Sequence, residues 1–139
     1  MARTRVALLV EDDPSLQKAV AAELKGEGFE VLLASDHESA VVHLAEHVPD
    51  IVCLDLGLPR ESGYELCEHI RKHPGLSGVP VLVMSERGFP EDMAHAEEAG
   101  ANAFLKKPFK MSALTKYVSA LLDGDKASRP SIRRLRRSE

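Results

Sequence analysis

Three carboxylates, a hydroxyl and a lysine stand at the ends of short apolar runs of the sequence, and side chains of these types could surround a divalent cation. An all-oxygen cluster of carboxylates suits Mg²⁺ or Mn²⁺, and a lysine beside it would add a fixed positive charge. Like charges brought so close either raise a pKa or require a cation. The residues are Glu11, Asp12, Asp55, Ser85 and Lys107.

Asp55 ends the run from Ile51 to Leu54, in which every position is apolar. Such a run indicates a strand buried on both faces, in the centre of a parallel sheet that helices cover. Ligands of these sheets bind beyond the carboxyl ends of the strands, where Asp55 would stand. Taken alone, Asp55 could cap the following turn, and the acidic residues 11–13 could simply begin a helix. The placement of all five side chains at strand ends favours a shared site.

The elements that must position these residues alternate between strand and helix patterns. Apolar runs predict strands over 6–10, 29–33, 51–55, 79–84 and 103–105. A helical pattern follows each strand: from Pro14 to Gly26, from a Ser35–Glu38 capping box to Pro49, around Leu66, Cys67 and Ile70, over 91–99, and over 110–122. Ala45 and Val48 would lie on the inward face of the second helix.

Five such strand–helix units joined by right-handed crossovers predict a doubly wound α/β sandwich of three layers. In the flavodoxin-like strand order 2-1-3-4-5, the first and third strands are neighbours. Their terminal carboxylates would then converge at the point where the strand order reverses.

The chain of 139 residues fits one domain, and 44% of its residues are hydrophobic. We expect residues 1–122 to form this domain and residues 123–139 to be a basic, disordered tail, because the first part carries a net charge of −7 and the second +3. The acidic body argues against nucleic-acid binding, whereas the tail could dock on an acidic partner, a membrane or nucleic acid. With no apolar run near ~20 residues and no secretion signal, we expect a cytoplasmic protein.

The site residues and their order resemble the receiver domains of response regulators in two-component signalling. The likeness runs from about Arg5 to Leu122. Its motifs are the pair Glu11-Asp12, Asp55 in Leu54-Asp55-Leu56-Gly57-Leu58-Pro59, Gly63, Ser85, Gly100-Ala101, Phe104 and Lys107-Pro108-Phe109.

This resemblance implies that Asp55 accepts a phosphoryl group from a histidine kinase or a phosphotransfer protein. It also implies that Lys107 and Ser85 contact phosphoryl oxygens and that the Lys107–Pro108 bond is cis. The implied Mg²⁺ ligands are Glu11, Asp12, Asp55 and the carbonyl of Gly57. Such a domain is a switch and not an enzyme, since it catalyses only its own phosphorylation and dephosphorylation.

The output that the resemblance implies is a population shift of a protein-interaction surface. Movement of the Ser85 hydroxyl onto the phosphoryl group would let Phe104 rotate, which reshapes the fourth helix, fifth strand and fifth helix for a downstream effector. Phe104 could alternatively be a plain core aromatic. Residues 123–139 hold no output or DNA-binding domain, so we expect a stand-alone, chemotaxis-regulator-like protein or a receiver separated from its effector.

Glu86 and Arg87 follow Ser85 and would modulate the site. The family usually has a small residue at the position of Glu86, and a carboxylate there could repel an incoming phosphoryl group. The alternative is therefore a pseudo-receiver, a phosphorylation-independent interaction module. A flavodoxin would need a phosphate loop in place of residues 11–13, and a haloacid dehalogenase phosphatase an aspartate in place of Gly57.

Two histidine pairs at helical spacing offer a weaker alternative site. His43 and His47, like His69 and His73, lie four residues apart on predicted helices, which could hold a metal. Neither pair has an obvious third ligand, so we expect the histidines to face solvent.

Overall fold

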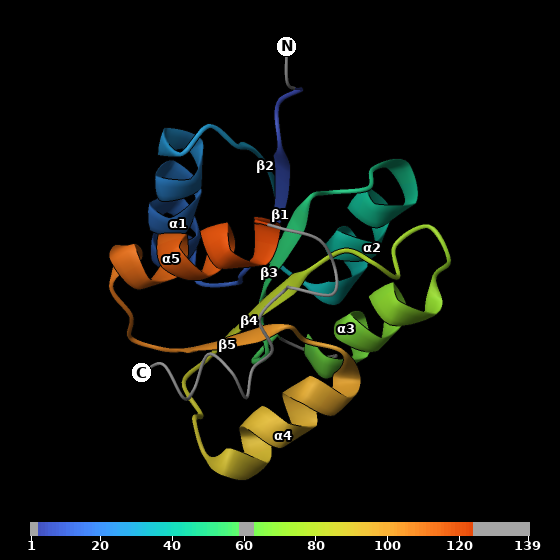
Figure 1. Ribbon diagram of the computed structural model, residues 1–139, viewed down its shortest axis with the longest axis vertical. Coiled ribbons are helices and arrows are strands. Elements are labelled where there is room, and N and C mark those ends of the chain that lie inside the picture. The colour runs from blue at the N-terminus through green and yellow to red at the C-terminus, as the bar shows by residue number, and fades with distance from the viewer. Residues whose placement is uncertain (1–2, 59–62, 124–139) are drawn as a thin grey trace.

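Five parallel strands form one sheet at the centre of the protein (Figure 1). The computed structural model describes residues 3–58 and 63–123. In sheet order the strands run β2-β1-β3-β4-β5, which confirms the predicted fold class. Their bounds are β1 (Val6–Val10), β2 (Glu30–Ala34), β3 (Ile51–Asp55), β4 (Val81–Ser85) and β5 (Ala103–Lys106).

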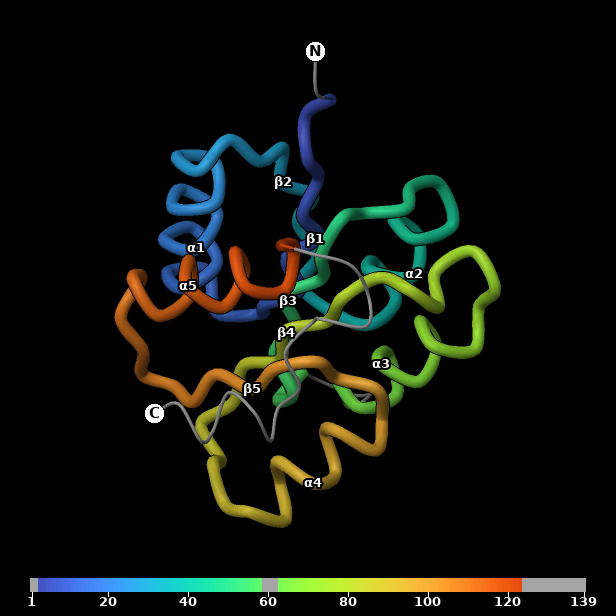
Figure 2. The backbone as a smooth tube through the Cα atoms, in the orientation of Figure 1, coloured from blue at the N-terminus to red at the C-terminus, as the bar shows by residue number. Residues whose placement is uncertain are grey.

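Helices cover both faces of this sheet, as the backbone trace in Figure 2 shows. Helices α1 and α5 lie on one face, and α2, α3 and α4 lie on the other (Figure 1). Their bounds are α1 (Pro14–Gly26), α2 (His37–Glu46), α3 (Gly63–Lys72), α4 (Pro90–Ala99) and α5 (Met111–Leu122). Within the described ranges, none of these helices has the length and hydrophobicity needed to cross a bilayer.

The two covered faces explain why consecutive positions of the central strands are apolar up to the residues that end them. Along β1, Leu8 and Val10 pack against the side of α2, α3 and α4, whereas Ala7 and Leu9 pack against the side of α1 and α5. All four side chains are fully buried. Burying a leucine side chain stabilises a fold by about 1.5–3 kcal/mol, so this double core holds the strand ends, and the polar residues on them, in place.

The two cysteines belong to this core. Cys53 lies on β3 and Cys67 on α3, and both are free and buried. Burial raises the pKa of the Cys53 thiol to about 12 and that of Cys67 to about 11. Both therefore stay protonated and unreactive at neutral pH, as expected of small core side chains.

The start and end of α2 differ from the prediction. The capping box uses Asp36 and Ser39 in place of Ser35 and Glu38: the Ser39 N–H donates to Asp36 Oδ1 at 2.8 Å, and the Asp36 N–H donates to Ser39 Oγ at 3.4 Å. The helix ends at Glu46, because Pro49 disfavours a helical conformation in the residue before it. Ala45, in the last turn of α2, and Val48, beyond its end, are both exposed, not inward-facing.

Strands β2 and β4 begin later than predicted. Strand β2 starts at Glu30, after Gly28 has turned the chain with a left-handed φ of 94°. Strand β4 starts at Val81, because the Val79 N–H donates to the Leu76 carbonyl in the preceding turn. Strand β4 ends at Ser85, where the sequence places the end of the fourth strand.

Candidate functional site

Three carboxylates meet where β1 and β3 lie side by side. Val10 pairs with Leu54 in the parallel register, so the residues that follow the two strands emerge together. One carboxylate oxygen each from Glu11, Asp12 and Asp55 lies within 4.8 Å of the others. Glu11 and Asp55 are buried and Asp12 is exposed. The structure thus brings together the three acids that the sequence places at these strand ends.

Lys107 reaches this cluster from the end of β5. Its Nζ donates to Glu11 Oε1 at 2.7 Å and lies 3.4 Å from Asp55 Oδ2. Burial lowers the pKa of Lys107, but the hydrogen bond to Glu11 and the charges of Asp55 and Glu11 outweigh it, so the pKa is raised. The Lys107–Pro108 bond is cis, as the resemblance implied. Lys107 is therefore a fixed cation between two carboxylates.

Glu11 has no exposed side-chain surface, and its two oxygens have separate partners. Oε1 accepts from Lys107, and Oε2 accepts from the Asp13 N–H at 3.0 Å. Burial raises the pKa of Glu11, and the hydrogen bonds from Lys107 and Asp13 offset that rise only in part. A further cation beside this carboxylate would lower the free energy of its ionised form.

The Asp55 carboxylate is oriented by two contacts. Its Oδ1 accepts from the Gly57 N–H at 2.9 Å, and its Oδ2 faces Lys107. Gly57 lines the same pocket as Asp55. The role of the Gly57 carbonyl as a metal ligand stays a prediction.

Ser85 lies beside these groups at the end of β4. It is 8% exposed, and its Oγ accepts from the Arg87 N–H at 3.0 Å, which leaves the hydroxyl proton to donate elsewhere. Phe104 pairs with Val83 in the neighbouring strand register and is buried in the core on the side of α4. The rotation of Phe104 in a second state stays a prediction.

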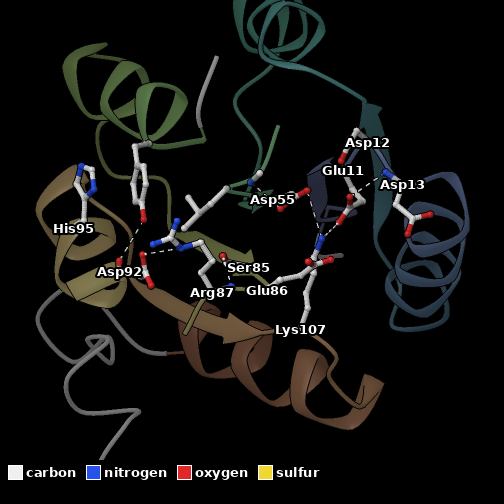
Figure 3. Close-up of a pocket in the computed structure, with 13 residues that line it drawn as sticks. Glu11, Asp12, Asp13, Asp55, Ser85, Glu86, Arg87, Asp92, His95 and Lys107 are labelled. Atoms are coloured by element: carbon white, nitrogen blue, oxygen red, sulfur yellow. Dashed lines mark hydrogen bonds and ion pairs between the residues drawn. The ribbon is translucent and has the colours of Figure 1, made fainter. Parts of the chain in front are cut away.

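The three acids, Ser85 and Lys107, but not Phe104, line a pocket of about 710 Å³ at the carboxyl ends of the strands (Figure 3). Among the described residues of its lining, carboxylates outnumber cations, so the pocket favours a divalent cation. The cations are Arg87 and Lys107. The carboxylates are Glu11, Asp12, Asp13, Asp55, Glu86 and Asp92.

The second wall of the pocket comes from α3 and α4, and the sequence analysis missed it. Tyr64 and His95 stack with ring centroids 3.8 Å apart and planes 16° apart, and the Tyr64 hydroxyl donates to the Asp92 carbonyl at 3.4 Å. Pro90 at the start of a helix that follows β4 would have indicated an acidic first turn near the carboxyl ends of the strands. No comparable signal marks Tyr64 or His95.

Glu86 and Arg87 line the pocket as the sequence predicts, and both are exposed. Glu86 also lines an adjoining pocket with Lys107 and Phe109. Arg87 forms an ion pair with Asp92, Nε to Oδ1 at 3.4 Å. Their effect on chemistry at Asp55 stays a prediction.

The histidine pairs do not form a comparable donor cluster. His37 brings a third ring near the second pair, with its centroid 6.4 Å from that of His69, but among the described residues only the acidic cluster has donor atoms that converge. His43 and His69 are half-buried and so only partly face solvent, contrary to prediction, whereas His47 and His73 are exposed. Residues 59–62 and, apart from Asp123, the predicted tail lie outside the described residues.

The acidic cluster itself fits a hard divalent cation. All three donors are carboxylate oxygens, which Mg²⁺ and Mn²⁺ prefer, and the exposed position of Asp12 leaves one side open to water ligands. Lys107 supplies only part of the positive charge that the buried carboxylates of Glu11 and Asp55 require. These residues could therefore hold Mg²⁺ without rearrangement of the strands.

The flavodoxin-like sheet, the converging acids and the lysine that precedes a cis proline together define the receiver class. The family model of the response regulator receiver domain matches residues 7–119, so the chain belongs to this family.

Individual relatives extend this result. The phosphate regulon transcriptional regulatory protein PhoB of Escherichia coli (strain K12) is 33% identical over 118 residues, which cover 85% of this chain and 52% of PhoB. The chain spans about half the length of the curated relatives it matches.

Solved structures share the fold. The chemotaxis response regulator CheY4 of Vibrio cholerae has a TM-score of 0.80 and 26% identity, with 84% of this chain and 98% of that one covered. The receiver domain of the sensor histidine kinase PA1611 from Pseudomonas aeruginosa, with a magnesium ion coordinated in its active-site cleft, has a TM-score of 0.80 and 29% identity, with 88% and 100% covered.

Proposed function

We propose that this receiver domain accepts a phosphoryl group on Asp55 in a Mg²⁺-dependent reaction. The observation that carries the proposal is the position of the Asp55 carboxylate, which stands at the end of the central strand with Oδ1 held by Gly57 and Oδ2 beside Lys107. The donor would be the phosphohistidine of a sensor kinase or a phosphotransfer protein.

In this reaction a carboxylate oxygen of Asp55 forms a bond to phosphorus while the bond from phosphorus to the imidazole nitrogen of the donor breaks. The electron pair of that bond stays on the imidazole, and the product on Asp55 is an acyl phosphate. Lys107 balances the charge of the phosphoryl oxygens, and the Ser85 hydroxyl donates to one of them.

Glu11, Asp12, Asp55 and the carbonyl of Gly57 would hold Mg²⁺. When bound, it neutralises charge on the transferring group. The magnesium ion in the PA1611 receiver domain supports this choice of metal.

The readout that we propose is a change of the surface built from α4, β5 and α5, which binds a downstream effector. Ser85 ends β4 beside the pocket, and Phe104 packs one strand away under α4, so a shift at Ser85 has a packed neighbour through which to act. On this proposal the domain is a cytoplasmic switch that catalyses only its own phosphorylation and dephosphorylation.

Incubation with acetyl phosphate and Mg²⁺, followed by intact-protein mass spectrometry, tests the proposal. We expect a phosphoryl adduct in the wild type and none in Asp55→Asn. Asp13→Asn is the matched control, because Asp13 lines the same pocket and asparagine caps a helix as well as aspartate does.

Glu86 in the pocket lining favours the pseudo-receiver as the second candidate. A folded wild type that takes up no adduct from small donors would support that candidate. An adduct that persists in Asp55→Asn would instead place the phosphoryl group elsewhere.

A further inference from the structure

Asp92 is a buried carboxylate that the proposed phosphoryl transfer does not use. It lies in the first turn of α4, and its side chain is 12% exposed. Its two oxygens have different partners: Oδ2 accepts from the Phe89 N–H at 3.2 Å, and Oδ1 lies 3.4 Å from Arg87 Nε. One oxygen is therefore tied to the backbone at the start of the helix, and the other faces the pocket.

The main chain of Asp92 is held as well. Its carbonyl accepts from the Tyr64 hydroxyl, and the Tyr64 ring stacks on His95 of the same helix. Burial raises the pKa of Tyr64, and the negative charge of Asp92 raises it further. Asp92 is thus a fixed anion between α3 and α4.

Arg87, in contrast, is a flexible cation at the rim of the pocket. Its side chain is 75% exposed, but its backbone N–H donates to Ser85 Oγ. Arg87 therefore starts next to the hydroxyl that would contact a phosphoryl group. Figure 3 shows its side chain turned toward Asp92, on the opposite side of the pocket from Lys107.

We propose that Asp92 is a positioning residue that holds the Arg87 guanidinium against α4 and so limits how often this cation meets an incoming phosphoryl donor. This inference rests on the proposed function of Asp55. Among the described residues that line the pocket, the cations are Arg87 and Lys107, and Lys107 is already paired with Glu11. Arg87 is the cation that can move, and a donor must compete with Asp92 for it.

The size of the restraint follows from the exposure of the pair. An ion pair with one exposed partner is weak, and it shifts the population of a side chain by up to about fivefold. Asp92 therefore restrains Arg87 without immobilising it. Removing the charge of Asp92 should release the guanidinium for most of the time.

Asp92→Asn removes this charge and keeps an oxygen for the Phe89 N–H. We expect phosphorylation by acetyl phosphate at subsaturating donor concentration to become about two- to fivefold faster at low salt. The gain should appear as a lower half-saturating donor concentration with little change in the maximal rate, because a free cation attracts the donor before reaction.

The same substitution in an Arg87→Gln background separates positioning from simple charge removal. We expect the gain from Asp92→Asn to vanish there, since no guanidinium remains to be released. Glu91→Gln is the matched control, because Glu91 is exposed in the same helical turn and its loss changes the net charge equally. An equal gain in the Arg87→Gln background, an equal gain from Glu91→Gln, or no gain at all would overturn the proposal.

Two further variants keep the test decisive. Asp92→Glu should restore the wild-type half-saturation if the carboxylate is what matters. Arg87→Gln changes an exposed side chain, so it gives a second route if Asp92→Asn folds poorly, and it should raise the half-saturating concentration at an unchanged melting temperature.

The adduct on Asp55 distinguishes the two proposals. Suppose that the wild type forms an adduct that Asp55→Asn lacks, and that Asp92→Asn has the same half-saturating donor concentration as the wild type. Only the positioning role of Asp92 then fails. If the folded wild type forms no adduct, the proposed function fails and the inference about Asp92 fails with it.

Discussion

Replacement of Lys107 by methionine tests the charge balance of the site. Methionine keeps the length and apolar stem of lysine and removes its charge. At an effective dielectric near 20, the Lys107 ammonium attracts Glu11 at 2.7 Å by about 6 kcal/mol and Asp55 at 3.4 Å by about 5 kcal/mol. The cost of desolvating these groups offsets most of that attraction. Removing one partner of such a buried pair has a net cost of about 3 kcal/mol.

We expect Lys107→Met to lower the free energy of unfolding by about 3 kcal/mol in the absence of divalent cations. Millimolar Mg²⁺ should then stabilise the variant more than the wild type, because the ion meets Glu11 and Asp55 without a competing ammonium. A ligand at a hundredfold excess over its dissociation constant stabilises the native state by about 2.7 kcal/mol, so recovery should be nearly complete.

Urea unfolding in the presence of EDTA or of Mg²⁺ measures the free energy of unfolding without the metal and its increase when the metal binds. Far-ultraviolet circular dichroism is the signal to follow, because the chain has no tryptophan for fluorescence. Lys116→Met is the control, since Lys116 is exposed on α5 and its loss changes the net charge by the same amount. If Mg²⁺ raised the free energy of unfolding of the wild type and of Lys107→Met by the same amount, the view that Lys107 and the metal neutralise the same carboxylates would be refuted.

Three further predictions concern other parts of the chain. Glu86→Gln should speed phosphorylation by small donors about threefold at low ionic strength and less at high salt, and equal rates at low salt would place the carboxylate outside the path of the donor. Asp50→Asn should cost about 1.5 kcal/mol, measured by urea unfolding, because Asp50 accepts from the Val6 N–H and from Arg3. Burial raises the pKa of Asp50, but these bonds lower it overall. The loss of unfolding free energy in Asp50→Asn should therefore have its full size above pH ~4 and shrink as the pH falls further. Deletion of residues 125–139 should leave the melting temperature nearly unchanged, and a large fall would show that the tail packs on the domain.

The strands and their order could be predicted because burial on both faces leaves a clear signal. A run such as 51–55, apolar up to its last residue, is typical of a central parallel strand, and five predicted strands with helices between them leave few possible topologies. The convergence of Glu11, Asp12 and Asp55 follows from that topology, since Asp55 ends β3 and the other two acids directly follow β1.

The boundaries of elements depend on local hydrogen bonds that the sequence leaves ambiguous. Ser35 and Asp36 are both good helix caps, and only the backbone geometry selects Asp36. Tyr64 and His95 were missed for a different reason. Their place in the pocket depends on the packing of α3 against α4, and no periodicity encodes the contact between two exposed or half-exposed helix faces.

Both cations among the described residues of the pocket are engaged with carboxylates, and this connects the site to α4. Lys107 is paired with Glu11 and Asp55, and Arg87 is paired with Asp92. A phosphoryl group on Asp55 would compete for both cations, because it carries more negative charge than the carboxylate it replaces. When Arg87 turns toward it, Asp92 loses its counter-ion in the first turn of α4. We therefore expect phosphorylation to change the contacts of α4 directly, through its own buried acid, in addition to the movement proposed for Ser85.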